Sequence, residues 1–179
     1  MQESRELIKK WRRRLRFLLA VAFWLIPLVT VAYWLCANML PLEEAQRALL
    51  VPIPGDLPLS ARLMAIAATM LPAGVSMYGV WVLKRLFGLY EQGEIFTEST
   101  VGCFRSLART LFLWFGASVL SVPLLSLALT LHFPPGERMV SLSLGSPDLT
   151  ALFVGAMLRV AAWVMAEGHR LSQDQELTI

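Results

Sequence analysis

Four long apolar runs dominate the sequence and decide its fold class. No Asp, Glu, Lys or Arg lies between Phe17 and Leu42, between Leu63 and Leu83, or between Thr110 and Phe133. A fourth run, from Leu149 to Ala166, is interrupted only by Arg159. A helix of about 20 apolar residues crosses the ~30 Å hydrocarbon core of a bilayer. The sequence therefore predicts an all-α integral membrane protein with four transmembrane helices.

The composition agrees with this fold class. Hydrophobic residues make up 56% of the 179 residues and charged residues only 16%, whereas soluble domains carry about 25% charged residues. A water-soluble globule of this size could not cover so much apolar surface. We expect a single membrane domain over residues 1–179. The predicted spans are 17–38, 63–83, 110–132 and 149–166, joined by outer loops 39–62 and 133–148 and a cytoplasmic loop 84–109, and followed by a cytoplasmic tail 167–179.

Basic residues predict which side of the membrane each connection faces. Seven of the 16 basic residues lie in the first 16 positions, where they are interpreted as a positive-inside anchor. An anionic-lipid or nucleic-acid patch is the alternative, although we expect no direct nucleic-acid binding. Twelve basic residues fall on the side of the termini and three on the other side. Both termini and the loop 84–109 are therefore predicted to be cytoplasmic.

Aromatic residues and prolines are placed as in membrane helices. Tyr33 and Trp34 near the outer end of the first span are expected to join an aromatic belt, whereas Trp24 lies deeper and is expected to pack. Prolines inside three spans predict kinks, or alternatively hinges: Pro27, Pro72 and Pro123.

The outer loops are too short to be domains. Residues 42–50 could form a short helix on the membrane surface. Residues 141–144 alternate Ser and Leu, a period-2 pattern that predicts a short strand. Ser146, Pro147 and Asp148 are typical of a helix start.

The loop 84–109 contains the most distinctive segment. The second span is predicted to continue as a helix to Gln92, with Gly93 as its C-terminal cap, and Thr97 is predicted to cap the third helix. This cytoplasmic helical extension either packs on itself as a hairpin or docks a cytoplasmic partner. The candidate docking residues are Tyr90, Gly93, Phe96, Thr97, Phe104 and Arg105.

The segments LYEQGEIFT (residues 89–97) and VGCFRSLA (residues 101–108) resemble the hallmark of the domain of unknown function 2975 family. The end of the chain, EGHRLSQDQELTI, is similar to that family's ending. The resemblance implies a small bacterial inner-membrane protein with four helices and no established enzymatic activity. It also implies a neighbouring helix-turn-helix regulator, and hence a membrane component of a regulatory pair.

The sequence lacks the residues that several kinds of membrane-protein chemistry require. Cys36 and Cys103 are predicted to lie at opposite membrane faces, beyond disulfide reach. His132 and His169 are likewise separated, so no metal or haem site is expected. No phosphate-binding loop or nucleophile signature is present. We therefore expect no enzyme and no cofactor.

Arg159 is the single charged residue inside a predicted span. One interpretation is that its side chain snorkels to the cytoplasmic interface. The other is an intramembrane ion pair with Glu167, or with an acidic residue of the loop 84–109 (Glu91, Glu94 or Glu98).

Two functional hypotheses follow. The first is a regulatory, signalling or scaffolding component that acts with a cytoplasmic DNA-binding regulator through its loop and tail. The alternative is a small transport or channel component that works as a homo-oligomer, motivated by the prolines in three spans.

Overall fold

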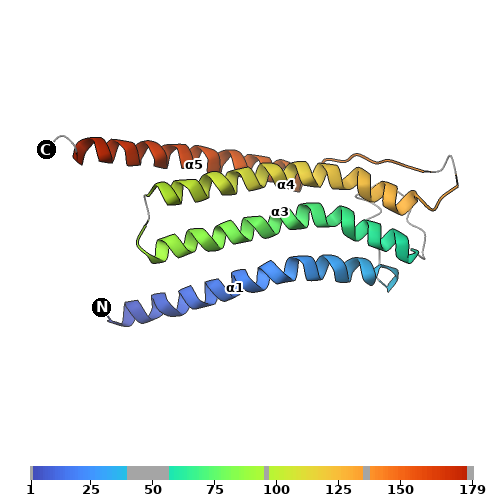
Figure 1. Ribbon diagram of the computed structural model, residues 1–179, viewed down its shortest axis with the longest axis horizontal. Coiled ribbons are helices and arrows are strands. Elements are labelled where there is room, and N and C mark those ends of the chain that lie inside the picture. Colours follow the sequence, from blue (N-terminus) through green and yellow to red (C-terminus); the bar gives the residue numbers. More distant parts are fainter. Residues whose placement is uncertain (1, 40–56, 95–96, 135–137, 177–179) are drawn as a thin grey trace.

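The protein is a bundle of four long helices joined by short connections (Figure 1). The structure, a computed structural model, describes residues 2–39, 57–94, 97–134 and 138–176. No strand occurs within these ranges, which confirms the all-α class. The helices are α1 (Gln2–Leu35), α3 (Leu59–Glu91), α4 (Glu98–Thr130) and α5 (Ser146–Glu176), with a short 3₁₀ helix, η1 (Ala37–Met39).

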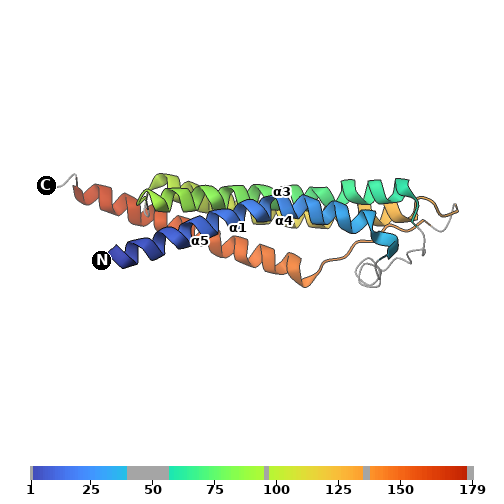
Figure 2. The ribbon, with the colours of Figure 1, turned by 90° about the horizontal axis from the view of Figure 1, so that it is seen from below.

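Two ends of the bundle are distinguished by their connections. At the hairpin end, α1 begins, α5 ends, and residues 92–97 join α3 to α4 (Figure 1). At the loop end, the chain passes from α1 to α3 and from α4 towards α5 (Figures 1 and 2). The predicted surface helix at residues 42–50 lies outside the described residues.

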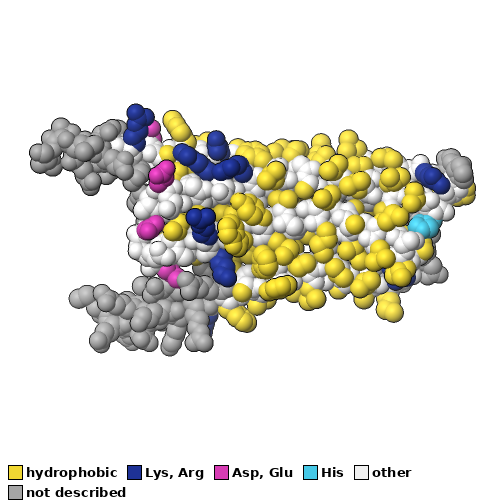
Figure 3. Space-filling model, viewed as in Figure 1, with side chains coloured by type: hydrophobic (Ala, Val, Ile, Leu, Met, Phe, Trp, Pro, Cys, Tyr) yellow, Lys and Arg dark blue, Asp and Glu magenta, His cyan; other side chains and the backbone are white. Residues whose placement is uncertain are grey.

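All four helices are long and apolar enough to span a membrane. Apolar side chains cover the middle of the molecule, and the described charged side chains gather towards the two ends (Figure 3). Many large apolar side chains are exposed along this band, as expected for a surface that faces lipid rather than water. The molecule is therefore a multi-pass membrane protein.

The helices pack in chain order. α1 packs against α3, α3 against α4, and α4 against α5. Small residues allow the close approaches. A Cβ atom added to Gly79 of α3 would lie 3.1 Å from Cγ2 of Thr110, and one added to Gly155 of α5 would lie 3.2 Å from Cβ of Leu111. These contacts set the axial register of the three later helices.

The core at the loop end contains a tryptophan that the sequence placed at the membrane surface. Trp34 is only 3% exposed, and its indole Nε1–H donates a hydrogen bond to Oγ1 of Thr69 at 3.1 Å. Trp24, which was expected to pack, is 72% exposed and makes an edge contact with Phe23. The predicted roles of the two tryptophans are thus reversed, because α1 contacts its neighbour along one face only.

The prolines lie inside unbroken helices. Hydroxyl groups nearby bond to main-chain carbonyls around two of them: Ser76 Oγ donates to the Pro72 carbonyl at 2.9 Å, and Ser126 Oγ donates to the Pro123 carbonyl at 2.9 Å. Such side-chain bonds are a common accompaniment of prolines in membrane helices. Each of the three spans therefore continues as one helix through its proline.

Candidate functional site

The turn between α3 and α4 is fixed by helix caps at both sides. Gly93 adopts φ 83°, a left-handed conformation that glycine tolerates without steric cost. Its N–H donates to the Tyr90 carbonyl, and the N–H of Glu94 donates to the Leu89 carbonyl. This pair of bonds is the Schellman motif, which satisfies carbonyls at a helix C-terminus. The predicted end of the helix at Gln92 and Gly93 is confirmed.

The start of α4 is capped as the sequence predicted. Thr97 is the N-cap, and its Oγ1 accepts a hydrogen bond from the N–H of Thr100 at 3.4 Å. Thr100 is fully buried, and its own hydroxyl donates to the Glu94 carbonyl at 2.7 Å. The side chain of Thr100 therefore links the start of α4 to the chain that follows α3.

Tyr90 and Phe104, two of the predicted docking residues, pack inside this hairpin. A small core of Val82, Leu86 and Cys103 is buried between α3 and α4, and both aromatic side chains pack against it. They are half-buried rather than projecting from the surface. The two aromatic side chains therefore contribute to the packing of the hairpin on itself.

The remaining docking candidates are dispersed. Gly93 is exposed at the tip of the turn, and Thr97 is half-buried at the N-cap. Phe96 lies outside the described residues. Arg105 is exposed but faces α5. The six residues therefore do not form one surface patch among the described residues, and docking stays a prediction.

Arg159 lies beside two arginines of α4. Arg105, Arg109, Arg159 and Trp163 line a pocket of about 410 Å³ between α4 and α5. Within the described ranges, no ion pair joins Arg159 to Glu167 or engages any of the three arginines. Arg159 lies within the candidate span Ser146–Gly168, as predicted, and the structure sets it level with Arg105 and Arg109.

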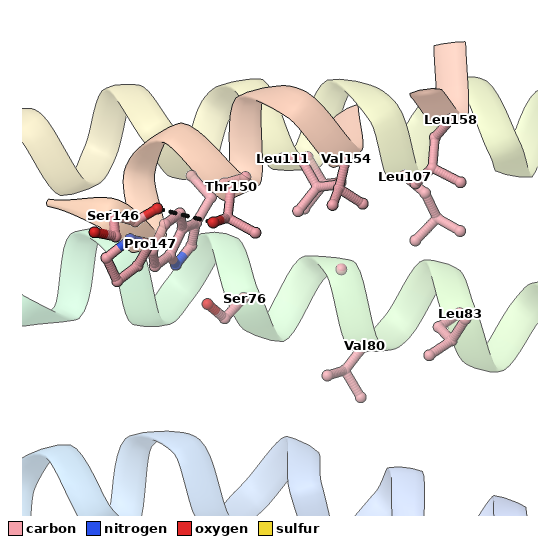
Figure 4. A pocket seen from close by; sticks show the side chains of 14 residues that line it. Ser76, Val80, Leu83, Leu107, Leu111, Ser146, Pro147, Thr150, Val154 and Leu158 are labelled. Carbon is pink, nitrogen blue, oxygen red and sulfur yellow. Dashed lines mark hydrogen bonds between the residues drawn. The ribbon is translucent and has the colours of Figure 1, made fainter. Parts of the chain in front are cut away.

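Arg159 lies at this level because α5 begins at an unexpected position along the bundle. Ser146 and Pro147 share a pocket with Ser76 of α3 and Trp114 of α4 (Figure 4). Trp114 lies 16 residues before the last residue of α4, which is about 24 Å of helix. α5 therefore begins beside the middle of α4, well short of the loop end (Figures 1 and 2).

The segment that leads to α5 returns along α4 as an extended chain. The predicted strand at residues 141–144 is absent, because the segment pairs with a helix and not with another strand. The Met139 N–H donates to Thr130 Oγ1 at 3.3 Å, and the Ser141 N–H donates to Ser126 Oγ at 3.0 Å. Ser126 and Thr130 are both fully buried.

These hydroxyls explain how an extended chain can lie against the apolar part of a bundle. Non-helical backbone at membrane depth is tolerated only where protein or a water-filled cavity covers it. Here Ser126 and Thr130 supply hydrogen-bond acceptors for two N–H groups of the segment. Sequence reasoning missed them, although two hydroxyl residues one turn apart near the end of a span were a visible signal.

α5 begins at Ser146, one residue earlier than predicted, and the side chain that bonds to the chain before the helix is that of Asp148 and not that of Ser146. Asp148 is 7% exposed, and its Oδ2 accepts a hydrogen bond from the Gly145 N–H at 2.8 Å.

The pocket beside the start of α5 has a volume of about 830 Å³ and is lined mainly by apolar side chains of α3, α4 and α5 (Figure 4). Ser76 and Thr150 add hydroxyl groups to this lining.

The cysteines lie far apart in the fold. Cys36 follows α1 at the loop end and is exposed, whereas Cys103 is buried in the hairpin core. His132 at the loop end forms a 2.8 Å hydrogen bond with Ser60. Among the described residues, no group of three His, Cys, Asp or Glu side chains could hold a metal ion.

Fold and composition define a helical, multi-pass membrane protein with four candidate spans. Residues 34–179 match the family described as protein of unknown function DUF2975. The chain belongs to this family, as its hairpin and tail motifs indicated. A search of curated proteins and a search of solved structures each found no match.

Proposed function

We propose that the protein is a regulatory subunit of the bacterial inner membrane that docks a small helix-turn-helix regulator at its hairpin end. In this arrangement both termini and the α3–α4 turn lie in the cytoplasm. The supporting observation is the distribution of basic residues. Lys84, Arg85, Arg105 and Arg109 belong to the hairpin half of α3 and α4, and cytoplasmic flanks of membrane helices are enriched in Lys and Arg.

The observation that carries the proposal is an acidic rim beyond these basic residues. Carboxylate side chains gather at the hairpin end, and most of the Lys and Arg side chains drawn there lie nearer the apolar band (Figure 3). The rim consists of Glu91, Glu94, Glu98 and Glu167. DNA-binding domains carry basic surfaces, and complementary charges speed and orient association.

The caps of the hairpin favour a docking role because they hold the rim in one geometry. The Schellman motif at Gly93 and the buried Thr100 fix the turn. Exposed positions on it include Gln92, Glu98 and Ser99. A partner would therefore meet a preformed polar surface, which lowers the entropic cost of binding.

The test is affinity purification of the tagged protein, expressed at its native level, from solubilised membranes, followed by mass spectrometry. We expect a small basic DNA-binding protein to co-purify. The double variant Gln92→Lys/Glu98→Lys, which makes the rim more positive, should lose it. Arg138→Glu at the loop end is the matched control and should retain it. A companion that survives the double variant, or none with the wild-type chain, contradicts the proposal.

Orientation needs its own measurement. We expect a C-terminal green fluorescent protein fusion to fluoresce and a C-terminal alkaline phosphatase fusion to stay inactive, since the first matures in the cytoplasm and the second in the periplasm. The reverse pattern would place the acidic rim outside the cell, away from any DNA-binding partner.

A second candidate function is small-molecule transport by a homo-oligomer. It is favoured by the position at which α5 begins, beside the middle of α4. Helix N-termini at mid-membrane depth are a feature of transporters, and the start of α5 borders the 830 Å³ apolar pocket. Its test is the flux of a fluorescent amphiphile through reconstituted vesicles. Gly79→Leu fills the pocket and should abolish flux, whereas Gly74→Leu, with nothing within 4 Å of its Cβ, should not.

A further inference from the structure

Three guanidinium groups from two helices converge on one pocket at the hairpin end. Arg105 and Arg109 lie one turn apart on α4, and Arg159 approaches from α5. Like charges held this close repel one another. Within the described ranges no carboxylate pairs with any of them. Among the side chains that the structure describes, the cluster therefore has no paired carboxylate to offset its repulsion.

The cluster lies where the apolar surface ends. On α5, Met157 lies further from the hairpin end than Arg159 and is 58% exposed, whereas Trp163, which lines the same pocket, lies nearer that end and is 66% exposed. On α4, Phe112 lies one turn further from the hairpin end than Arg109 and is 41% exposed. Tryptophan prefers the level of lipid headgroups. The arginines therefore sit at the boundary between acyl chains and headgroups.

We infer that the pocket between α4 and α5 binds the phosphate group of an anionic phospholipid. Arginine binds phosphate through two parallel N–H···O bonds. Basic pockets between membrane helices are suited to acidic headgroups. The pocket volume of about 410 Å³ lies within the ~300–1,000 Å³ range of ligand sites.

The surroundings favour a lipid over a free phosphate ion. A phosphate ion would use the guanidinium groups alone. A phospholipid would also place its acyl chains over the exposed apolar side chains of Phe112 and Met157, which lie on the membrane side of Arg109 and Arg159. This site is separate from the proposed docking rim, so its test does not depend on a regulator being found.

The experiment measures lipid retention by native mass spectrometry. The full-length protein is reconstituted into nanodiscs of equal parts phosphatidylglycerol and phosphatidylcholine and then released from them. We expect the wild-type chain to retain phosphatidylglycerol. Because each surface arginine contributes about a fivefold factor to the affinity for acidic lipid, Arg109→Gln/Arg159→Gln should lower that affinity about thirtyfold.

The matched control is Lys84→Gln/Arg85→Gln, which removes the same charge from α3 at the same end of the bundle but outside the pocket. It should lose clearly less affinity for phosphatidylglycerol than the pocket variant, because Lys84 and Arg85 do not line the pocket and attract acidic lipid only through the charge of the surface. Circular dichroism and size-exclusion chromatography report whether each variant folds. If the double variant does not fold, Arg159→Gln alone replaces it, with an expected loss of about fivefold.

A second arm separates the two sources of phosphate. Thermal unfolding is followed in neutral detergent with added phosphatidylglycerol, phosphatidylcholine or inorganic phosphate. We expect only phosphatidylglycerol to raise the Tm of the wild-type chain, and the rise to disappear in Arg109→Gln/Arg159→Gln. Equal retention by the pocket variant and the control overturns the inference, as does an equal rise in Tm with inorganic phosphate.

Discussion

The main-chain N–H of Ser141 donates a hydrogen bond to Oγ of Ser126 at 3.0 Å. This contact joins the extended chain before α5 to the C-terminal third of α4. With the Thr130 bonds one turn away, it lets α5 begin beside Trp114 rather than at the loop end. The depth of the fourth helix, and with it the position of Arg159, depends on two hydroxyl groups of α4.

Removing the hydroxyl at position 126 should destabilise the protein. Ser126→Ala leaves the part-buried Ser141 N–H without its acceptor, which costs about 1–3 kcal/mol. The free energy of unfolding, measured by chemical denaturation in detergent, should fall by that amount.

Ser141→Ala is the matched control for this prediction. The Ser141 hydroxyl oxygen is buried and has no hydrogen-bond partner within the described structure. Its removal should leave stability unchanged or raise it slightly. Equal losses in the two variants would mean that the Ser126 contact contributes nothing specific.

Trp34→Phe should weaken the packing of α1 on α3. The substitution removes the donor to Thr69 and some buried ring volume, with an expected loss of roughly 1–2 kcal/mol. Trp24→Phe, at a position 72% exposed, should change stability by less than about 0.5 kcal/mol. A double-mutant cycle with Thr69→Val measures the hydrogen bond itself. A coupling energy near zero would show that the bond is not formed.

Gly93→Ala should loosen the turn between α3 and α4. A side chain at φ 83° costs roughly 1–2 kcal/mol. The lost stability should appear as faster limited proteolysis at residues 92–97 and a lower Tm. Gly102→Ala is the control, because Gly102 lies inside α4 with nothing within 4 Å of an added Cβ. It should stabilise by up to roughly 1 kcal/mol. If both variants behave alike, the turn does not need the left-handed conformation.

Gly155→Val should push α5 away from α4. An added Cβ would already lie 3.2 Å from Cβ of Leu111 and 3.5 Å from the Ala108 carbonyl oxygen. Overpacking of this kind costs roughly 1–3 kcal/mol. Denaturation in a detergent series gives the loss, and Gly116→Val, on an open face of α4, should be close to neutral. Tolerance of valine at position 155 would argue against the α4–α5 register.

Much of the helical framework could be predicted from the sequence, because each helix end carries its own chemistry. Gly93 and Thr97 bracket the turn between α3 and α4, as predicted, since a left-handed glycine and an N-cap threonine act through bonds only a few residues long. Asp148 likewise marks the start of α5 through a bond to Gly145.

The position of each helix along the bundle axis could not be predicted in this way. Apolar runs show which residues avoid water, but they do not show how far one helix slides along another. That offset is set by contacts distant in sequence, such as Gly155 against Leu111 and Ser141 against Ser126. The level of Arg159 follows from the offset, and so does its proximity to Arg105.

The chain-order packing of the described helices has a consequence for biosynthesis. Each helix makes its extensive contacts with the helix before it or after it along the chain. No early helix must wait beside the translocon for a distant partner to emerge. The bundle can therefore be completed stepwise in the order of translation, and local contacts of this kind favour rapid assembly.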